Sequence, residues 1–288
     1  MSRRRAAVLG HPVAHSLSPV LHRAAYQALG LDWRYDAVDV TAEGLPALLD
    51  GLTPAWVGLS LTMPLKRTVL GLLDQVEPLA VAVGAVNTVV LTARDARIHR
   101  AGSTTDVPGF VDALTAAGLG AGTVSGATVL GAGATAACAL GALAALRVGR
   151  TVVYARGPVR AAEITQVAGR LGLPVEVRPW EQAAQGLGAQ LVVSTTPAGA
   201  PDHLARLLGG AGRGTLFDVV YAPWPTVLAQ AWAAAGGRVL GGLDLLVAQG
   251  VHQVVRMLAA AGGDGTDPTV VEVVRTAMRQ AAVGSRPG

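Results

Sequence analysis

Short apolar runs alternate with helical stretches along this chain of 288 residues, and this alternation limits its fold more than any other feature. Apolar runs bounded by turn residues are typical of buried strands, and the intervening stretches are long enough for helices. The alternation therefore predicts an α/β protein in which helices cover sheets. The predicted strands are Ala6–Leu9, Ala55–Leu61, Ala85–Leu91, Thr128–Leu130, Thr151–Tyr154, Leu191–Ser194 and Thr215–Val219.

Composition excludes several classes of protein. Hydrophobic residues make up 51% of the chain and charged residues 15%, which is typical of a well-buried globular protein. The single cysteine, Cys138, suits a reducing cytosol, so we expect a cytoplasmic protein. The net charge of +4 comes without a basic run interleaved with aromatic residues, so we expect no nucleic-acid partner. The uncharged stretch 117–146 contains few bulky apolar residues and a glycine-rich turn, so we expect no membrane span.

Three helix starts stand out, and each follows a probable strand. In Ser18-Pro19 a hydroxyl precedes a proline, which predicts an N-cap at Ser18, and Gly30 closes that helix. Thr62–Pro64 begins a helix with Lys66 in its first turn, and Asp106 begins another. We expect their side chains to gather at the carboxyl edge of a sheet, where α/β proteins bind ligands.

Lys66 is the only lysine among the 23 basic residues of the chain. Arginine does not release its proton near neutral pH, whereas a lysine can be tuned to do so. Composition alone leaves chance survival and function equally open, but the position at a strand–helix junction favours function. Asp106 is its candidate partner, although the residues by themselves support an N-cap role for Asp106 equally well.

The segment Val129–Ala136 leaves a predicted strand and enters a predicted helix with the pattern G-x-G-x-x-A. Such a turn lets a pyrophosphate approach the backbone and the free N–H groups of the helix N-terminus. The next strand, Thr151–Tyr154, completes a βαβ unit, so we predict a dinucleotide site rather than a packing turn. No acid follows that strand, whereas Arg156 and Arg160 do. Guanidinium groups pair with a 2′-phosphate, which predicts NADP over NAD unless both arginines are ordinary surface charges.

Seven segments form an ordered set of motifs: Gly10–Pro19, Ser60–Lys66, Ala85–Thr88, Gly102–Asp106, Gly131–Gly133 with Arg156, Asp218–Tyr221 and Gly242–Gln249. Over nearly the whole chain this set resembles the shikimate dehydrogenase family. The chain departs from the family pattern at five positions. Ser60 and Thr104 replace asparagines, Ala155 and Gly157 flank Arg156 where Asn and Thr are common, and Ser194 opens a segment usually written N-A-T.

The resemblance implies two α/β domains that close on a cleft. Residues 1–105, completed by C-terminal helices in 242–288, would form the substrate-binding and catalytic domain. Residues 106–241 would form a Rossmann-like, doubly wound NADP-binding domain. The implied reaction is the reversible NADPH reduction of 3-dehydroshikimate to shikimate, in chorismate and aromatic amino acid biosynthesis. The alternatives are a broader quinate/shikimate dehydrogenase and a non-catalytic NADP-binding regulator on the same fold.

The resemblance also implies roles for individual residues. Lys66 and Asp106 would be catalytic, whereas Asn87 and Gln249 taken alone would be turn or helix-surface residues. Binding of substrate would involve Ser16, Ser18 and Tyr221 at the carboxylate, and Thr62, Asn87, Asp106 and Gln249 at the ring. Binding of NADP would involve Gly131, Ala132, Gly133, Ala134, Thr135, Arg156, Arg160, Thr195, Val219 and Gly242.

No metal is expected, because His11, His15 and His22 are not accompanied by a carboxylate or cysteine cluster. A homodimer is compatible with the sequence.

Overall fold

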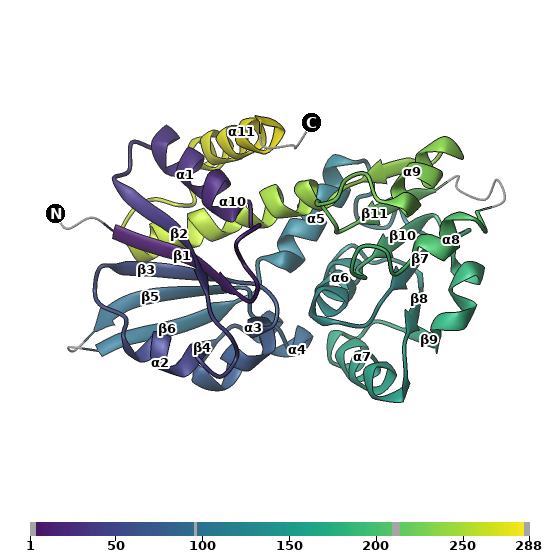
Figure 1. Cartoon of the computed structure of the whole chain (residues 1–288), viewed down its shortest axis with the longest axis horizontal. Helices are drawn as coiled ribbons and strands as arrows, with labels where there is room; N and C mark the ends of the chain where they lie inside the picture. The colour runs from purple at the N-terminus through teal and green to yellow at the C-terminus, as the bar shows by residue number, and fades with distance from the viewer. Residues whose placement is uncertain (1–3, 95–96, 209–213, 285–288) are drawn as a thin grey trace. The chain divides into compact units, whose positions relative to one another are not determined.

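The structure, a computed structural model, describes residues 4–94, 97–208 and 214–284. The chain forms two compact units (Figure 1). Unit 1 contains the residues up to Gly109 and those from Leu246 onward, and unit 2 is Phe110–Leu245. Each boundary falls four residues after the predicted one, inside helices α5 (Asp106–Ala116) and α10 (Gly242–Ala260). Each unit contains a six-stranded sheet with packed helices, which confirms the α/β class.

Unit 1 is built on a mixed sheet of order β2-β1-β3-β5-β6-β4. β1, β2 and β3 are parallel, whereas β5 runs antiparallel to both β3 and β6. The strands are β1 (Arg4–Gly10), β2 (Trp33–Asp39), β3 (Trp56–Leu61), β4 (Gln75–Val76), β5 (Thr88–Arg94) and β6 (Arg97–Ser103).

Alternating side chains of β1 divide the core of unit 1 between the two faces of its sheet. Ala6 and Val8 pack with residues of α1 (Ser18–Ala28), α10 and α11 (Pro268–Gly284). Ala7 and Leu9 pack against the opposite group of helices, which is the period of two expected for a strand. That group consists of α2 (Leu45–Asp50), α3 (Leu65–Thr68), the 3-10 helix η1 (Val69–Leu72) and α4 (Pro78–Val83).

Unit 2 has a fully parallel sheet of order β12-β11-β10-β7-β8-β9. This order reverses at β7, as in doubly wound dinucleotide-binding folds, and confirms the predicted Rossmann-like architecture. The strands are β7 (Gly126–Leu130), β8 (Arg150–Ala155), β9 (Val175–Pro179), β10 (Leu191–Ser194), β11 (Thr215–Asp218) and β12 (Arg238–Leu240). Its remaining helices are α6 (Ala134–Ala145), α7 (Pro158–Leu171), the 3-10 helix η2 (Trp180–Gly186), α8 (Asp202–Ala205) and α9 (Val227–Ala234).

Two sequence predictions need correction. The predicted strand Ala85–Leu91 begins only at Thr88, because the preceding backbone bonds to a helix instead: Val86 N–H donates to the Lys66 carbonyl. Ser18 is the first residue of α1 rather than its N-cap. Leu17 occupies the cap position, and no side chain caps the helix. Among the described residues, no helix is long and apolar enough to cross a membrane.

Candidate active site

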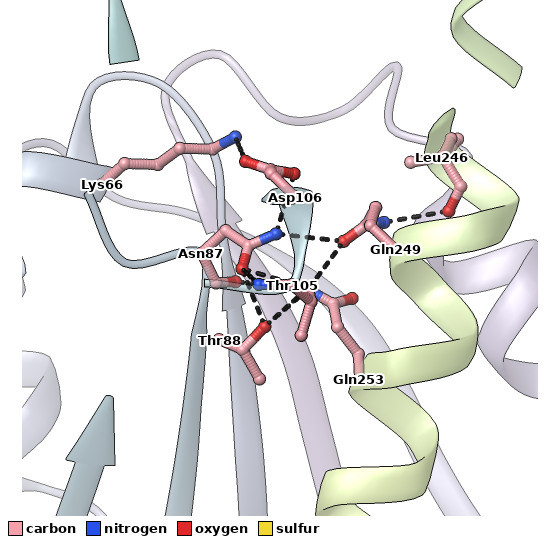
Figure 2. A network of polar contacts seen from close by, with 8 residues as sticks. All are labelled: Lys66, Asn87, Thr88, Thr105, Asp106, Leu246, Gln249 and Gln253. Atoms are coloured by element: carbon pink, nitrogen blue, oxygen red, sulfur yellow. Dashed lines mark hydrogen bonds and ion pairs between the residues drawn. The ribbon is translucent and has the colours of Figure 1, made fainter. Parts of the chain in front are cut away.

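Lys66 and Asp106 form an ion pair at the end of the unit 1 sheet (Figure 2). Lys66 is the second residue of α3, which follows β3, and Asp106 is the first residue of α5, which follows β6. Lys66 Nζ lies 2.6 Å from Asp106 Oδ2, and the two side chains are 16% and 6% exposed. Partial burial strengthens the attraction between the charges and leaves the ammonium group partly accessible. The structure therefore brings the two predicted catalytic residues together.

The carboxylate of Asp106 is held by side chains and does not cap α5. Thr105 occupies the cap position, because its carbonyl accepts the N–H of Gly109. Asp106 Oδ1 accepts a hydrogen bond from Asn87 Nδ2 at 2.9 Å, while Oδ2 faces Lys66. The capping alternative is therefore wrong, and the orientation of Asp106 depends on residues distant in sequence.

Asn87 is the hub of this network, and its side chain is buried. Its Oδ1 accepts the backbone N–H of Thr105 at 2.7 Å and lies 3.0 Å from Thr88 Oγ1. Its Nδ2 donates to Gln249 Oε1 at 3.2 Å as well as to Asp106. Asn87 and Gln249 are therefore buried structural partners rather than turn or helix-surface residues. The amide of Asn87 is fully engaged within unit 1, so it orients both Asp106 and Gln249.

Gln253 and Ser60 extend the network and were not identified as site residues from sequence. Gln253 lies one helical turn after Gln249 on α10, and both glutamines are buried. Gln253 Nε2 donates to the Asn87 carbonyl at 3.2 Å and to Thr88 Oγ1 at 3.1 Å. Ser60 Oγ donates to Gln253 Oε1 at 2.9 Å. Two sequence features could have identified them: the spacing of four residues between Gln249 and Gln253, and the serine at position 60 where the family has asparagine.

The loop after β1 lies against the segment that carries Lys66. Thr62 N–H donates to the Leu9 carbonyl, and His11 N–H donates to the Met63 carbonyl. Within this loop, Ser16 Oγ accepts the backbone N–H of Ser18 at 3.3 Å. The predicted substrate residues Ser16, Ser18 and Thr62 thus all belong to unit 1.

Tyr221 is the exception among the predicted substrate residues, because it belongs to unit 2.

The three N-terminal histidines have separate environments. His11 Nδ1 pairs with Asp39 Oδ1 at 2.7 Å, whereas His15 is exposed. His22 is buried, stacks on Tyr35 with 3.9 Å between ring centroids, and contacts the Ser18 carbonyl through Nδ1 at 2.9 Å. Burial lowers the pKa of His22 to about 4. Among the described residues, no group of three or more His, Cys, Asp or Glu could hold a metal ion.

Unit 2 carries the glycine-rich turn between β7 and α6. Gly131 has φ +107°, and a Cβ there would lie 2.7 Å from Thr195 Oγ1, so both conformation and space require glycine. Gly133 is the N-cap of α6 and has open space where a Cβ would lie. The helix then begins at Ala134, followed by Thr135, so its first free N–H groups lie beside the turn.

The other predicted cofactor residues follow neighbouring strands of the same sheet. Arg156 comes directly after β8 and is exposed, and Arg160 is exposed on the first turn of α7, where it pairs with Glu163 at 2.8 Å. Thr195 follows β10, and its Oγ1 donates to the Leu130 carbonyl at 2.9 Å. Val219 follows β11, and a Cβ at Gly242 would lie 2.2 Å from its carbonyl oxygen. Ala132 completes the set, inside the glycine turn.

A mixed-sheet unit with a buried lysine–aspartate network, joined to a Rossmann-type unit with a glycine turn, defines the class of two-unit α/β dehydrogenases. Residues 8–89 match the family model for the shikimate dehydrogenase substrate binding domain. The chain is 37% identical over 286 residues to the NADP(+) shikimate dehydrogenase of a Synechococcus strain, covering 95% of this chain and 92% of that protein. The chain therefore belongs to the shikimate dehydrogenase family, which confirms the resemblance.

Solved structures agree with this assignment. The shikimate dehydrogenase of Mycobacterium tuberculosis has a TM-score of 0.84 and 36% identity, with 98% of this chain and 99% of that chain covered. The Thermus thermophilus enzyme, solved with NADP(H) and shikimate, has a TM-score of 0.76 and 36% identity, covering 96% and 99%. A 5-ketofructose reductase from Gluconobacter has a TM-score of 0.75 and 25% identity, covering 97% and 99%. The architecture thus also occurs in a protein named for the reduction of a different ketone.

Proposed function

We propose that the chain is an NADP-dependent oxidoreductase that reversibly reduces 3-dehydroshikimate to shikimate, in chorismate and aromatic amino acid biosynthesis. The observation that carries the proposal is the Lys66–Asp106 pair, 2.6 Å apart in a buried amide network. Relatives at 32–40% identity over most of the chain are named NADP(+) shikimate dehydrogenases.

In this reaction a hydride passes from the nicotinamide to the ketone carbon, and the ketone oxygen takes up a proton. The developing alkoxide needs a nearby positive group and a proton source. The Lys66 ammonium can supply both, because the lysine side chain is partly accessible and its Nζ lies beside Asp106. Asp106 balances its charge and holds Nζ in place.

The substrate carries a carboxylate and several ring hydroxyls. We assign Ser16, Ser18 and Tyr221 to the carboxylate, and Thr62, Asn87, Asp106 and Gln249 to the ring. The internal bonds of Asn87 add a second role, because a hydroxyl that contacts Asn87 must share the amide with Asp106 or Gln249. Because Asn87 keeps these internal partners when a hydroxyl is absent, discrimination against analogues that lack a hydroxyl must come from the other groups that face the substrate.

For NADP we assign the pyrophosphate to the turn from Gly131 to Thr135, where Gly133 has open space in place of a Cβ and the helix N-terminus is positive. Arg156 and Arg160 would bind the 2′-phosphate, since both are exposed beside the end of β8. Thr195, Val219 and Gly242 would lie along the remainder of the cofactor. Unit 1 would thus be the substrate-binding unit and unit 2 the NADP-binding unit.

A cytoplasmic location and a homodimeric assembly are further expectations. Light scattering of the purified chain would test the homodimer directly, because a monomer has a mass of 29.1 kDa.

The decisive experiment measures oxidation of NADPH with 3-dehydroshikimate and reduction of NADP+ with shikimate. We expect turnover in both directions, a lower kcat/KM with NAD+, and a lower kcat/KM with quinate. Comparable rates with quinate would instead establish the broader enzyme. Binding of NADPH without any turnover would support the regulator and refute the proposed function.

A further inference from the structure

A directed series of hydrogen bonds connects Tyr35 on β2 with the active-site carboxylate. Tyr35 OH donates to Ser60 Oγ at 2.6 Å, and Ser60 Oγ donates to Gln253 Oε1 at 2.9 Å. Gln253 Nε2 donates to Thr88 Oγ1 at 3.1 Å, and Thr88 Oγ1 donates to Asn87 Oδ1 at 3.0 Å. Asn87 Nδ2 finally donates to Asp106 Oδ1 at 2.9 Å (Figure 2 shows the last part).

All five bonds point the same way, because the Asp106 carboxylate and the backbone carbonyl of Asn87 can only accept hydrogen bonds. An ionised carboxylate only accepts hydrogen bonds, so Asn87 must turn its NH2 group toward Asp106. The carbonyl of Asn87 only accepts, so Gln253 must turn its NH2 group toward it and its oxygen toward Ser60. Ser60 must then donate to Gln253 and accept from Tyr35.

Tyr35 is well suited to begin the series. Its ring is completely buried and stacks on His22, which fixes the direction of its hydroxyl. Burial also raises the pKa of Tyr35, so the hydroxyl stays protonated and remains a donor at neutral pH. Ser60 and Gln253 are 3% and 2% exposed, so bulk water cannot replace a hydrogen bond that a substitution removes from either side chain.

We propose that Tyr35, Ser60 and Gln253 are positioning residues that hold Asn87, and through it Asp106, in the orientation that the reaction requires. The inference rests on the proposed function and deepens it. Their hydrogen bonds lead to Asp106 through Thr88 and Asn87, so they act through those two residues. The serine at position 60 matters because its small hydroxyl lies between the Tyr35 hydroxyl and the Gln253 oxygen and contacts both.

Position 60 allows a matched test of the hydroxyl. Ser60→Thr and Ser60→Val add side chains of nearly equal size, but only threonine keeps the hydroxyl. Any cost of overfilling this buried site is therefore shared, and the difference between the variants reports the hydrogen bonds. We expect kcat with shikimate to be about fivefold higher in Ser60→Thr than in Ser60→Val, the scale of one or two buried hydrogen bonds. The KM for NADP+ should be the same in both.

Position 35 offers an independent pair. Tyr35→Phe removes the first donor of the series, and Tyr26→Phe removes an equally buried hydroxyl from the same core. Within the described residues, the Tyr26 hydroxyl has one hydrogen-bond partner, Met257 Sδ, at 3.8 Å. We expect Tyr35→Phe to lower kcat about fivefold and Tyr26→Phe to leave it unchanged, with thermal unfolding measured for both.

Equal kcat values for Ser60→Thr and Ser60→Val, or equal losses in Tyr35→Phe and Tyr26→Phe, would overturn the inference in favour of simple packing. The experiment distinguishes failure of the proposed function from failure of the inference. A wild-type chain that does not turn over shikimate overturns the proposed function, and the inference with it. An active wild type with matched variants that behave alike overturns the inference only.

Discussion

The two units build their candidate sites by different means. In unit 1 the site consists of side chains, since Lys66, Asp106, Asn87 and Gln249 contact one another directly or through a shared amide. In unit 2 it consists mainly of backbone, at a turn where Gly131 leaves no room for a Cβ. The first site should therefore be damaged by removing atoms, and the second by adding them.

The largest effect should come from removing the charged pair of unit 1. We expect Lys66→Ala and Asp106→Ala each to lower kcat/KM for shikimate by at least ~100-fold, the scale of acid–base groups. Steady-state kinetics checks this, with circular dichroism to confirm folding. Near-normal rates in both folded variants would remove these residues from the mechanism.

A third variant, Lys66→Arg, sharpens the interpretation of that loss. Arginine keeps the positive charge but does not release a proton near neutral pH. If Lys66 itself delivers the proton, Lys66→Arg should be almost as impaired as Lys66→Ala. A largely active arginine variant would instead assign Lys66 to stabilisation of the alkoxide, with water as the proton source.

The next effect concerns the buried histidine beside the unit 1 network. The pKa of His22 falls from 6.5 to about 4 on folding, so the unfolded chain takes up the proton first as pH decreases. The contribution of neutral, buried His22 to the free energy of unfolding is therefore complete above about pH 6.5 and is lost between that pH and about pH 4. Near pH ~5 the loss amounts to about 2 kcal/mol of the free energy of unfolding.

Urea unfolding of wild type and His22→Phe at neutral pH and near pH ~5 measures this contribution. The phenylalanine keeps an aromatic ring against Tyr35 and removes the titrating group, so its unfolding free energy should fall less with pH. The exposed His203 of unit 2 provides the control, and His203→Gln should follow the wild-type curve. A His22→Phe variant with the wild-type pH dependence would contradict the assignment.

Two alanine substitutions in the glycine turn test the backbone character of unit 2. Gly131→Ala forces a positive φ on a side chain, at a cost of about 1–2 kcal/mol, in addition to contact with Thr195. We expect it to lower both the unfolding free energy and the affinity for NADP+. Gly133→Ala meets open space at φ −87°, so only cofactor affinity should fall. Calorimetric binding of NADP+ to Gly133→Ala at wild-type strength would show that the pyrophosphate does not approach there.

The smallest effect should come from the exposed arginine after β8. Arg156→Gln should raise the KM for NADP+ about fivefold and leave that for NAD+ unchanged, because an exposed ion pair contributes only about 1 kcal/mol. Arg150 begins the same strand, is also exposed and pairs with Glu176, so Arg150→Gln is the matched control. Equal effects of Arg156→Gln on both cofactors would remove Arg156 from 2′-phosphate recognition.

Local patterns predicted the strand–helix junctions and the glycine turn. Residues that follow one another along the chain leave clear signals of this kind, because an apolar run, a proline and a glycine each constrain their own backbone. These local signals explain why each of the seven predicted strands has a counterpart in the structure. They also explain why Lys66 and Asp106 were identified as candidates. The same local reasoning failed at Ser18, which is the first residue of the helix, while Leu17 holds the cap position without any side-chain cap.

The amino-acid sequence alone was sufficient for the α/β class, the family and the catalytic candidates, since these depend on short motifs. Tertiary structure was required to show that Asp106 faces Lys66 and Asn87 instead of capping its helix. It also revealed the series from Tyr35 through Ser60 and Gln253, because Ser60 and Gln253 are 193 positions apart in the chain. A hydrogen bond depends on distances of about 3 Å and on direction, and only folding brings such distant groups to that separation.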